Sequence, residues 1–249
     1  MQFLVLTQAI GFVLAVGWVV INSDPLAPWH ALAAAAGAGL GVTIGVFALF
    51  QAMVVGKVSV VAPISATGVL LPVAIGIARG EHSTAVQAVG IIAAIAGVVL
   101  AARARGEDQV TRGEAGLGLA LVAAEGTGLF LCLMAPASRH GVAWAVLVAR
   151  AVPGAALFTA VCISGASLRP ALEPRTAATI LSAALLAFGG VALYGAATLY
   201  GQLVIVSVLG SLYPVVIVLL AHRILGERLD GAQRVGVAAV LCGVVCLSA

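Results

Sequence analysis

Two ionisable residues, Glu125 and Arg150, lie inside long apolar stretches of the sequence. Charged side chains are costly in hydrocarbon, and in membrane proteins they usually face the interior of a helix bundle or an aqueous path. If the two stretches form antiparallel helices joined by a short turn, a rise of about 1.5 Å per residue places both side chains at the same depth within roughly 3 Å. The spacing therefore allows an ion pair between Glu125 and Arg150 across a cavity.

Each of these residues has a functional and a structural interpretation. A carboxyl group in a membrane span can exchange protons or bind a cationic substrate group, which favours a functional role for Glu125. For Arg150, the sequence supports substrate contact and a purely structural tie between two helices equally well.

A second set of polar and aromatic residues lies in the apolar stretches around two prolines. Tyr and Gln side chains offer hydrogen bonds from a mainly apolar wall, which is the usual construction of a small-molecule site. Each residue is also compatible with ordinary helix packing. The set comprises Gln51, Ser65, Tyr194, Tyr200, Gln202, Ser207 and Tyr213.

The two prolines, Pro72 and Pro214, fall near the middle of apolar stretches. Each removes a backbone hydrogen bond, and the freed carbonyl can contact substrate or permit bending. A static kink and a gating hinge are both compatible with this position. A Gly-Glu pair follows each proline, and we interpret Glu81 and Glu227 as interfacial residues that anchor a hairpin between two helices.

The composition places all of these residues in a membrane. Of the 249 residues, 63% are hydrophobic and 8% are charged, and the mean hydropathy is +1.21, whereas an ordinary soluble domain has roughly 25% charged residues. Too few polar side chains remain to cover a water-facing surface. This excludes a soluble enzyme, a secreted disulfide scaffold, a nucleic-acid binder and a disordered chain, and predicts an all-α integral membrane protein in a lipid bilayer.

The cysteines and histidines form no metal-site pattern. The four cysteines lie in apolar runs, where a small buried hydrophobe is the simplest role, and His30, His82 and His140 lack ligand spacing. The sequence has no HExxH or GxSxG motif and no paired Asp within the spans. We therefore expect no metal, no cofactor and no enzymatic step.

The apolar runs predict nine membrane-spanning helices, since a span needs about 20 apolar residues. The longest polar interruption, Ala101–Glu114, separates four helices from five. We therefore predict two domains, residues 1–104 and 115–249. The predicted helices cover roughly residues 3–21, 30–53, 58–78, 84–103, 115–135, 142–164, 177–199, 202–224 and 231–248.

The two sides of this interruption share sequence, which is common in transporter folds. Leu70-Leu71-Pro72-Val73 matches Leu212-Tyr213-Pro214-Val215. Further on, the glycines and glutamine of the first copy recur in the second at one constant spacing. The matching positions are Gly80-Glu81, Gln87, Gly90 and Gly97 in the first copy and Gly226-Glu227, Gln233, Gly236 and Gly243 in the second.

The segment SLYPVVIVLLAHRILGERLDGAQRVGVAAVLCGVVCL, which begins at Ser211, resembles the closing half of an EamA domain of the drug/metabolite transporter superfamily. The resemblance extends over Ala31–Arg103 and Gly116–Leu247. It implies two inverted five-helix repeats that transport small organic molecules through a central cavity. Arg150 is similar to an arginine that the family commonly carries, and Glu125 stands in the first helix of its repeat, as does the membrane-embedded Glu of small multidrug members.

Family members usually have ten helices, whereas nine are predicted here as four plus five. Met1 falls where the second family helix begins, so the first helix is absent, and we favour a truncated start over a lost helix. The expected function is secondary transport of small organic metabolites or drugs by alternating access. The alternative is a non-transporting or truncated membrane subunit that needs a partner.

Loop charges predict the orientation. Nine Lys and Arg residues fall in loops on the side of the N-terminus and two on the opposite side, and cytoplasmic loops carry the excess of positive charge. We therefore expect a cell-membrane protein with a cytoplasmic N-terminus, although the family arrangement would place this start outside. The expected partners are a small-molecule substrate and the bilayer, with no nucleic acid, and a homodimer stays open.

Overall fold

The computed structural model confirms the all-α fold class. No strand occurs among the residues that it describes. These residues are 2–56, 58–81, 84–101, 113–164, 174–212, 215, 216, 219, 223 and 231–247.

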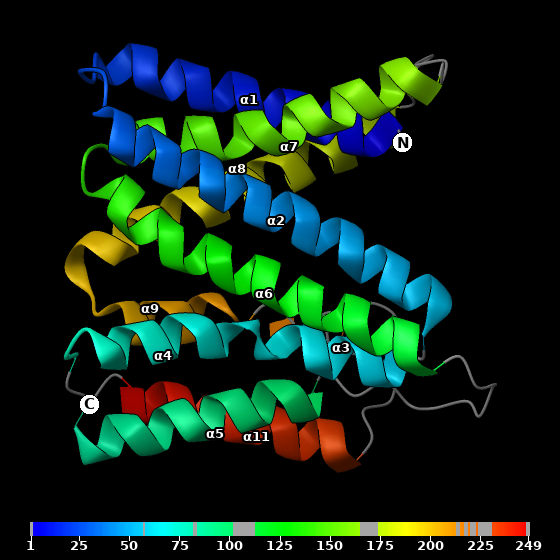
Figure 1. Ribbon diagram of the computed structural model, residues 1–249, viewed down its shortest axis with the longest axis vertical. Coiled ribbons are helices and arrows are strands. Elements are labelled where there is room, and N and C mark those ends of the chain that lie inside the picture. Colours follow the sequence, from blue (N-terminus) through cyan, green and yellow to red (C-terminus); the bar gives the residue numbers. More distant parts are fainter. Residues whose placement is uncertain are drawn as a thin grey trace. The chain divides into compact units, whose positions relative to one another are not determined.

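The helices follow the predicted apolar runs within a few residues at each end (Figure 1). Five of the described helices are long and apolar enough to cross a membrane, and the shorter ones are apolar as well. The elements are α1 (Gln2–Asn22), α2 (Trp29–Val55), α3 (Val58–Ala66), the 3-10 turn η1 (Thr67–Val69), α4 (Leu70–Ala78), α5 (Ala85–Ala101), α6 (Gly113–Ser138), α7 (Val142–Ser164), α8 (Pro174–Tyr200), α9 (Leu203–Gly210) and α11 (Gly231–Leu247).

Two of the predicted helices are interrupted rather than continuous. The range 58–78 contains η1 between α3 and α4, and the range 202–224 has a turn at Ser211 and Leu212 after α9. In the first case Pro72 has no N–H to donate to the carbonyl of Gly68, so the regular α-helical pattern fails at that residue. In the range 58–78, the interruption therefore lies next to Pro72, where the sequence predicted a lost backbone hydrogen bond.

The chain forms two compact units, which are described separately here. Unit 1 consists of residues 1–43 and 133–200, and unit 2 consists of residues 44–132 and 201–249. Helices α2 and α6 each contribute to both units. The units therefore do not coincide with the predicted sequence domains, which remain a prediction.

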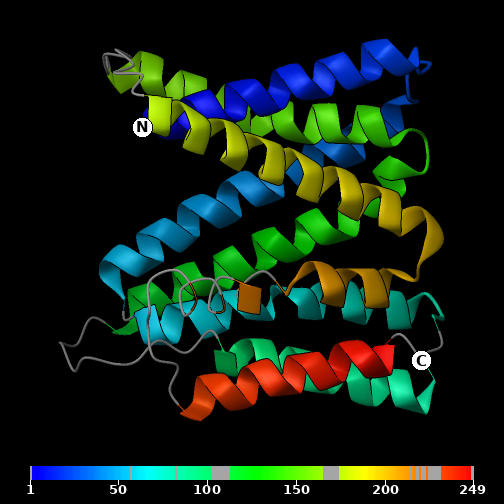
Figure 2. The ribbon, with the colours of Figure 1, turned by 180° about the vertical axis from the view of Figure 1, so that it is seen from behind.

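In unit 1, α1 packs against α7 and α8, with α8 crossing behind (Figures 1 and 2). The indole Nε1 of Trp144, near the start of α7, donates to the carbonyl of Asp24, beyond the end of α1, at 3.3 Å. Trp18 of α1 meets Phe188 of α8 edge to face, with ring centroids 5.7 Å apart. These contacts hold the three helices together around one face of α7.

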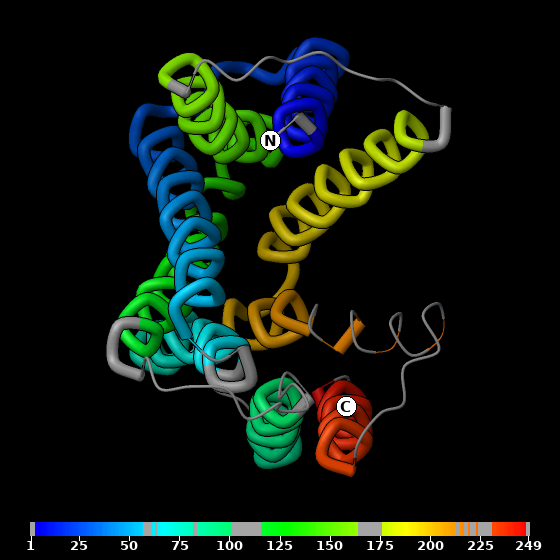
Figure 3. The backbone as a smooth tube through the Cα atoms, turned by 90° about the vertical axis from the view of Figure 1, so that its right-hand side faces the viewer, coloured from blue at the N-terminus to red at the C-terminus, as the bar shows by residue number. Residues whose placement is uncertain are grey.

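In unit 2, α5 and α11 lie side by side along most of their length (Figure 3). Glycines permit this close approach, because small residues let helix backbones meet. A Cβ atom on Gly97 would lie 2.7 Å from the carbonyl oxygen of Gly236, and one on Gly243 would lie 2.7 Å from the carbonyl oxygen of Gly90. Two glycine pairs therefore set the distance between these helices.

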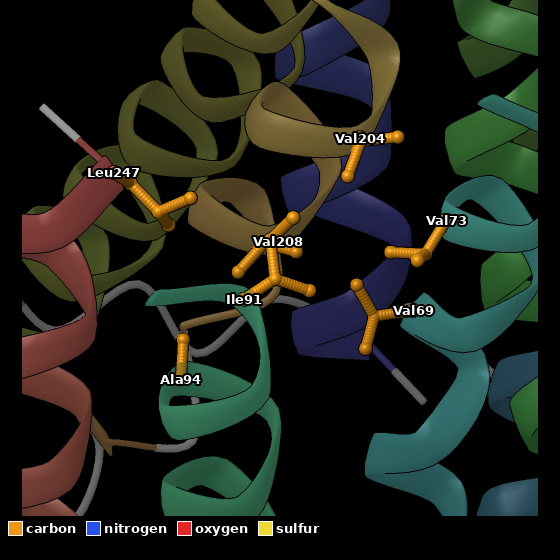
Figure 4. Packing of buried hydrophobic residues seen from close by; sticks show 7 residues of the cluster. All are labelled: Val69, Val73, Ile91, Ala94, Val204, Val208 and Leu247. Atoms are coloured by element: carbon orange, nitrogen blue, oxygen red, sulfur yellow. The ribbon is translucent and has the colours of Figure 1, made fainter. Parts of the chain in front are cut away.

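The core of unit 2 joins helices from both ends of the sequence. Val69 and Val73 lie at the junction of η1 and α4, Ile91 is on α5, and Val204 and Val208 are on α9 (Figure 4). Leu247, at the end of α11, closes the same cluster. This packing fixes α9 against the break in the α3–α4 segment.

Outside these cores, large apolar side chains are widely exposed. Ile21 and Ile163 are each 83% exposed, and Leu186 is 77% exposed. Exposure of so many large apolar side chains is a liability in water. It is the surface expected of helices whose outer faces meet lipid.

Candidate functional site

Arg150 lies at the centre of unit 1, on α7, and is 7% exposed. Its Nη1 atom donates to the side-chain oxygen of Gln8 on α1 at 3.4 Å, and its Cζ atom lies 5.9 Å from the ring centroid of Phe188 on α8. Both partners come from helices distant in sequence. The structure therefore brings Arg150 into a three-helix contact that includes Gln8 and Phe188, neither of which the sequence had singled out.

Gly11 makes room for this guanidinium on α1. A Cβ atom at Gly11 would lie 2.5 Å from Nη1 of Arg150 and 3.2 Å from its Cζ atom. Any side chain at this position would therefore displace the guanidinium. On the same helix, Gly17 has open space around it.

A cavity of about 510 Å³ lies beside this contact, between α1 and α7. Its volume is typical of small-molecule sites, which are mostly apolar with a few polar groups. Gln8 is the polar side chain in its lining, and Ala151 is the residue next to Arg150. The lining comprises Val5, Gln8, Ala9, Phe12, Ala151, Gly154, Ala155, Leu157 and Phe158.

Glu125 lies in unit 2, on α6, and its side chain is exposed. The neighbouring residue Ala124 is buried, and its backbone lies against Gly68, where a Cβ atom would collide with it. Within its unit, Glu125 forms no hydrogen bond or ion pair to a described residue. Because Arg150 belongs to unit 1, the predicted pair between the two stays a prediction.

Glu81, by contrast, has a defined structural partner. Gly80, with φ of +82°, ends α4 in the left-handed conformation, and the Glu81 N–H donates back to the Gly76 carbonyl at 3.0 Å. The Glu81 carboxylate then accepts from the N–H groups of Leu203 and Val204 at 3.1 and 3.0 Å. It therefore caps the N-terminus of α9, and the interpretation of Glu81 as a hairpin anchor was wrong.

The second set of predicted site residues is divided between the units. Tyr194 is buried and Tyr200 is 90% exposed, both on α8 of unit 1. In unit 2, Ser65 is buried and donates its hydroxyl to the Val61 carbonyl of its own helix at 2.9 Å. Contact of any of these residues with substrate stays a prediction.

The remaining members of this set are in unit 2 or are undescribed. Ser207 is fully buried on α9, whereas Gln51 and Gln202 are exposed. Pro72 is buried at the start of α4. Tyr213 and Pro214, together with Glu227 and His82, lie outside the described residues.

Two histidines meet in unit 1, His30 in the first turn of α2 and His140 in the turn between α6 and α7. The Nε2 atoms of His30 and His140 are 3.2 Å apart, and both side chains are exposed. Among the described residues, no group of three or more potential ligands is gathered that could hold a metal ion.

The fold and the site together define a helical membrane protein with a buried arginine beside an apolar cavity. The sequence profile described as "EamA-like transporter family" matches residues 114–249, more than half of the chain. The chain therefore belongs to the EamA-like transporter family, as the resemblance predicted. This family is generally non-enzymatic.

Solved structures show the same fold. Twenty-five chains match, and one crystal structure aligns with a TM-score of 0.76 at 18% sequence identity, covering 99% of this chain and 88% of that chain. At this identity the likeness shows the fold alone. No curated protein matches the sequence.

Proposed function

We propose that this chain is a secondary transporter that moves small organic metabolites or drugs across the cell membrane by alternating access. The observation that carries the proposal is the apolar cavity between α1 and α7 in a chain of a transporter family. Its one polar lining side chain, Gln8, is suited to orienting a ligand within an otherwise apolar wall.

Alternating access between two inverted repeats has support from the glycine contacts of α5 and α11. The sequence similarity pairs Gly90 with Gly236 and Gly97 with Gly243. Exchanging the two copies converts the contact between Gly90 and Gly243 into the contact between Gly236 and Gly97, and both contacts are present. This exchange is the arrangement that a twofold relation between the copies would produce.

Flux into liposomes tests the proposal. The purified chain is first screened with small organic compounds for ligand-induced thermal stabilisation, because a ligand that binds the folded state raises its stability. Compounds that stabilise it are then followed as they enter proteoliposomes. Saturable, protein-dependent flux is expected. Binding without flux of any stabilising compound would favour the alternative, a membrane subunit that depends on a partner.

The exposed carboxyl group of Glu125 on apolar α6 motivates a second prediction. If Glu125 exchanges protons during transport, Glu125→Gln should abolish proton-linked uptake or exchange while leaving the melting temperature unchanged, because the side chain contributes no described hydrogen bond. The measurement is uptake in proteoliposomes with and without an imposed pH gradient. A variant whose uptake keeps the pH dependence of the parent would refute proton coupling through Glu125.

We further propose a cytoplasmic N-terminus, from the excess of Lys and Arg on that side of the predicted spans. Ser23 lies just after α1 and is exposed. In a background without the native cysteines, Ser23→Cys should react with a membrane-impermeant thiol reagent added to whole cells. If Cys at this position reacts only after the cells are opened, the proposed orientation is wrong and the N-terminus lies on the outer side of the membrane.

A further inference from the structure

Arg150 has more hydrogen-bonding capacity than its surroundings use. A guanidinium carries five N–H donors in a planar fork, yet the Nε atom of Arg150 is buried without a partner. Its hydrogen bond to Gln8, at 3.4 Å, is longer than the 2.7–3.2 Å that is usual for N–H donors. The fork is therefore buried but poorly satisfied.

No described carboxylate of unit 1 neutralises this charge. Asp24 is the only acidic side chain among the described residues of the unit. It lies beyond the end of α1, and Gln8 is 14 residues from Asn22, which is about 21 Å along a helix. A buried charge is stable when it is paired, so within the described part of unit 1 the guanidinium has no anionic partner and can accept one from a ligand.

Gln8 connects the arginine to the cavity. Its side chain contacts Nη1 of Arg150 and also lines the cavity. The amide oxygen occupies the place where the oxygen of an anionic ligand would accept from the same donor. The rest of the lining is apolar and includes Phe12 and Phe158, which suits an apolar ligand body.

We propose that Arg150 is the anion-recognition residue of this cavity, and that the ligand class is small organic carboxylates with an apolar body. A carboxylate matches the arginine fork in a bidentate geometry. In this assignment the carboxylate displaces the Gln8 amide from Nη1 and reaches the free Nε donor, while the apolar body fills the cavity. The inference rests on the proposed function, because it takes this cavity as the substrate site.

Ligands matched in shape but not in charge provide the first test. The full-length protein is placed in phosphatidylcholine nanodiscs, and the binding of 4-phenylbutyrate, 4-phenylbutanamide and 4-phenylbutylamine is measured by calorimetry. Binding of the carboxylate is expected to be at least about tenfold tighter than that of the amide, as is typical of a hydrogen-bonded charged group, and the amine should not bind. Equal affinity of acid and amide, or no saturable binding of the acid, would overturn the assignment.

Two variants and one control tie the preference to Arg150. Arg150→Gln should remove the preference for the acid over the amide. Gly11→Ala should reduce it while keeping the charge, because the new Cβ displaces the guanidinium. Gly17→Ala, on the same helix in open space, should leave it unchanged. If Arg150→Gln does not fold, Gly11→Ala still decides the matter, and a full preference in that variant contradicts the proposal.

Further measurements on the same protein distinguish a lipid headgroup from a soluble anion as the ligand. They also distinguish failure of this inference from failure of the proposed transport function. Adding phosphatidylglycerol to the nanodiscs should not compete with 4-phenylbutyrate, and competition would assign the site to a lipid headgroup instead. Flux of uncharged compounds that does not depend on Arg150 would overturn this inference and leave transport standing. Selective binding of the acid without flux of any compound would support this inference and contradict the proposed transport function.

Discussion

Gly243→Ala is expected to destabilise the protein, although alanine is the better helix former. The new Cβ would lie 2.7 Å from the carbonyl oxygen of Gly90 and 2.8 Å from the N atom of Ala94. These are backbone atoms of α5 that cannot move without separating the two helices. The cost of such overpacking is about 3 kcal/mol, which corresponds to a fall of roughly 6–12 °C in melting temperature for a chain of this size.

Gly231→Ala is the matched control for this prediction. Gly231 is the first residue of α11 and has open space around it. With no clash, this exchange should be neutral or should stabilise the helix by up to about 1 kcal/mol. Thermal unfolding followed by tryptophan fluorescence measures both variants. If Gly243→Ala melts at the same temperature as Gly231→Ala, the glycine contacts do not set the distance between α5 and α11.

Gly97→Ala extends the same prediction to the second glycine pair. Its Cβ would meet the carbonyl oxygen of Gly236 at 2.7 Å. Because either substitution already separates the two helices, the double variant should lose less stability than the sum of the two single losses. Neighbouring sites that share contacts are non-additive in this way.

Glu81→Ala is expected to loosen the first turn of α9. The carboxylate accepts from Leu203 and Val204, and its removal leaves both N–H groups without these acceptors. Loss of a helix cap with a charged acceptor costs about 2 kcal/mol. Hydrogen–deuterium exchange should show faster exchange at the amides of Leu203 and Val204, together with a lower melting temperature.

Two further variants separate the cap from a general effect of charge. Asp24→Ala removes one negative charge from a side chain that caps no helix in the described part of the chain, and it should leave exchange in α9 unchanged. Gly76→Ala keeps Glu81, but its Cβ would meet the Val204 side chain and lie 2.9 Å from the Oε2 atom, so it displaces the carboxylate and the start of α9 from each other. It should reproduce part of the Glu81→Ala effect. Unaltered exchange at Leu203 and Val204 in both Glu81→Ala and Gly76→Ala would mean that α9 is held by its apolar core alone.

Most of the helix positions could be predicted, because the length of an apolar run determines a membrane span. The break at Thr67–Val69 could not be read from hydropathy, since the valines and leucines around it are as apolar as a continuous helix. The signal that was present is Gly68, four residues before Pro72. Its carbonyl would be the hydrogen-bond acceptor of residue 72 in a regular helix.

The candidate site was only partly predictable. Arg150 stood out as an ionisable residue within a span, but its partners Gln8 and Phe188 lie on helices that no local pattern connects to α7. Gln8 met the criterion that selected Gln51, a polar side chain in an apolar run, and could have been included. The repeat pointed to Glu81. Its hydrogen bonds to Leu203 and Val204, which lie 122 and 123 residues further along the chain, could not be predicted without the fold.

The sequence also contains a helix-capping signal at the start of α5. Thr84 and Gln87 form a reciprocal capping box, in which each backbone N–H donates to the side chain of the other at 3.1 and 3.2 Å. Asp230 and Gln233 have the same spacing in the second copy. In the first copy, Gln87 therefore contributes to the initiation of α5.

The exchanged glycine contacts between α5 and α11 also limit how the two copies can diverge during evolution. A larger residue at Gly90, Gly97 or Gly243 meets backbone atoms of the opposite helix. Substitution at these three positions is therefore restricted, whereas the exposed residues between them can vary among apolar types. Sequence similarity between the two copies would persist longest at these three positions.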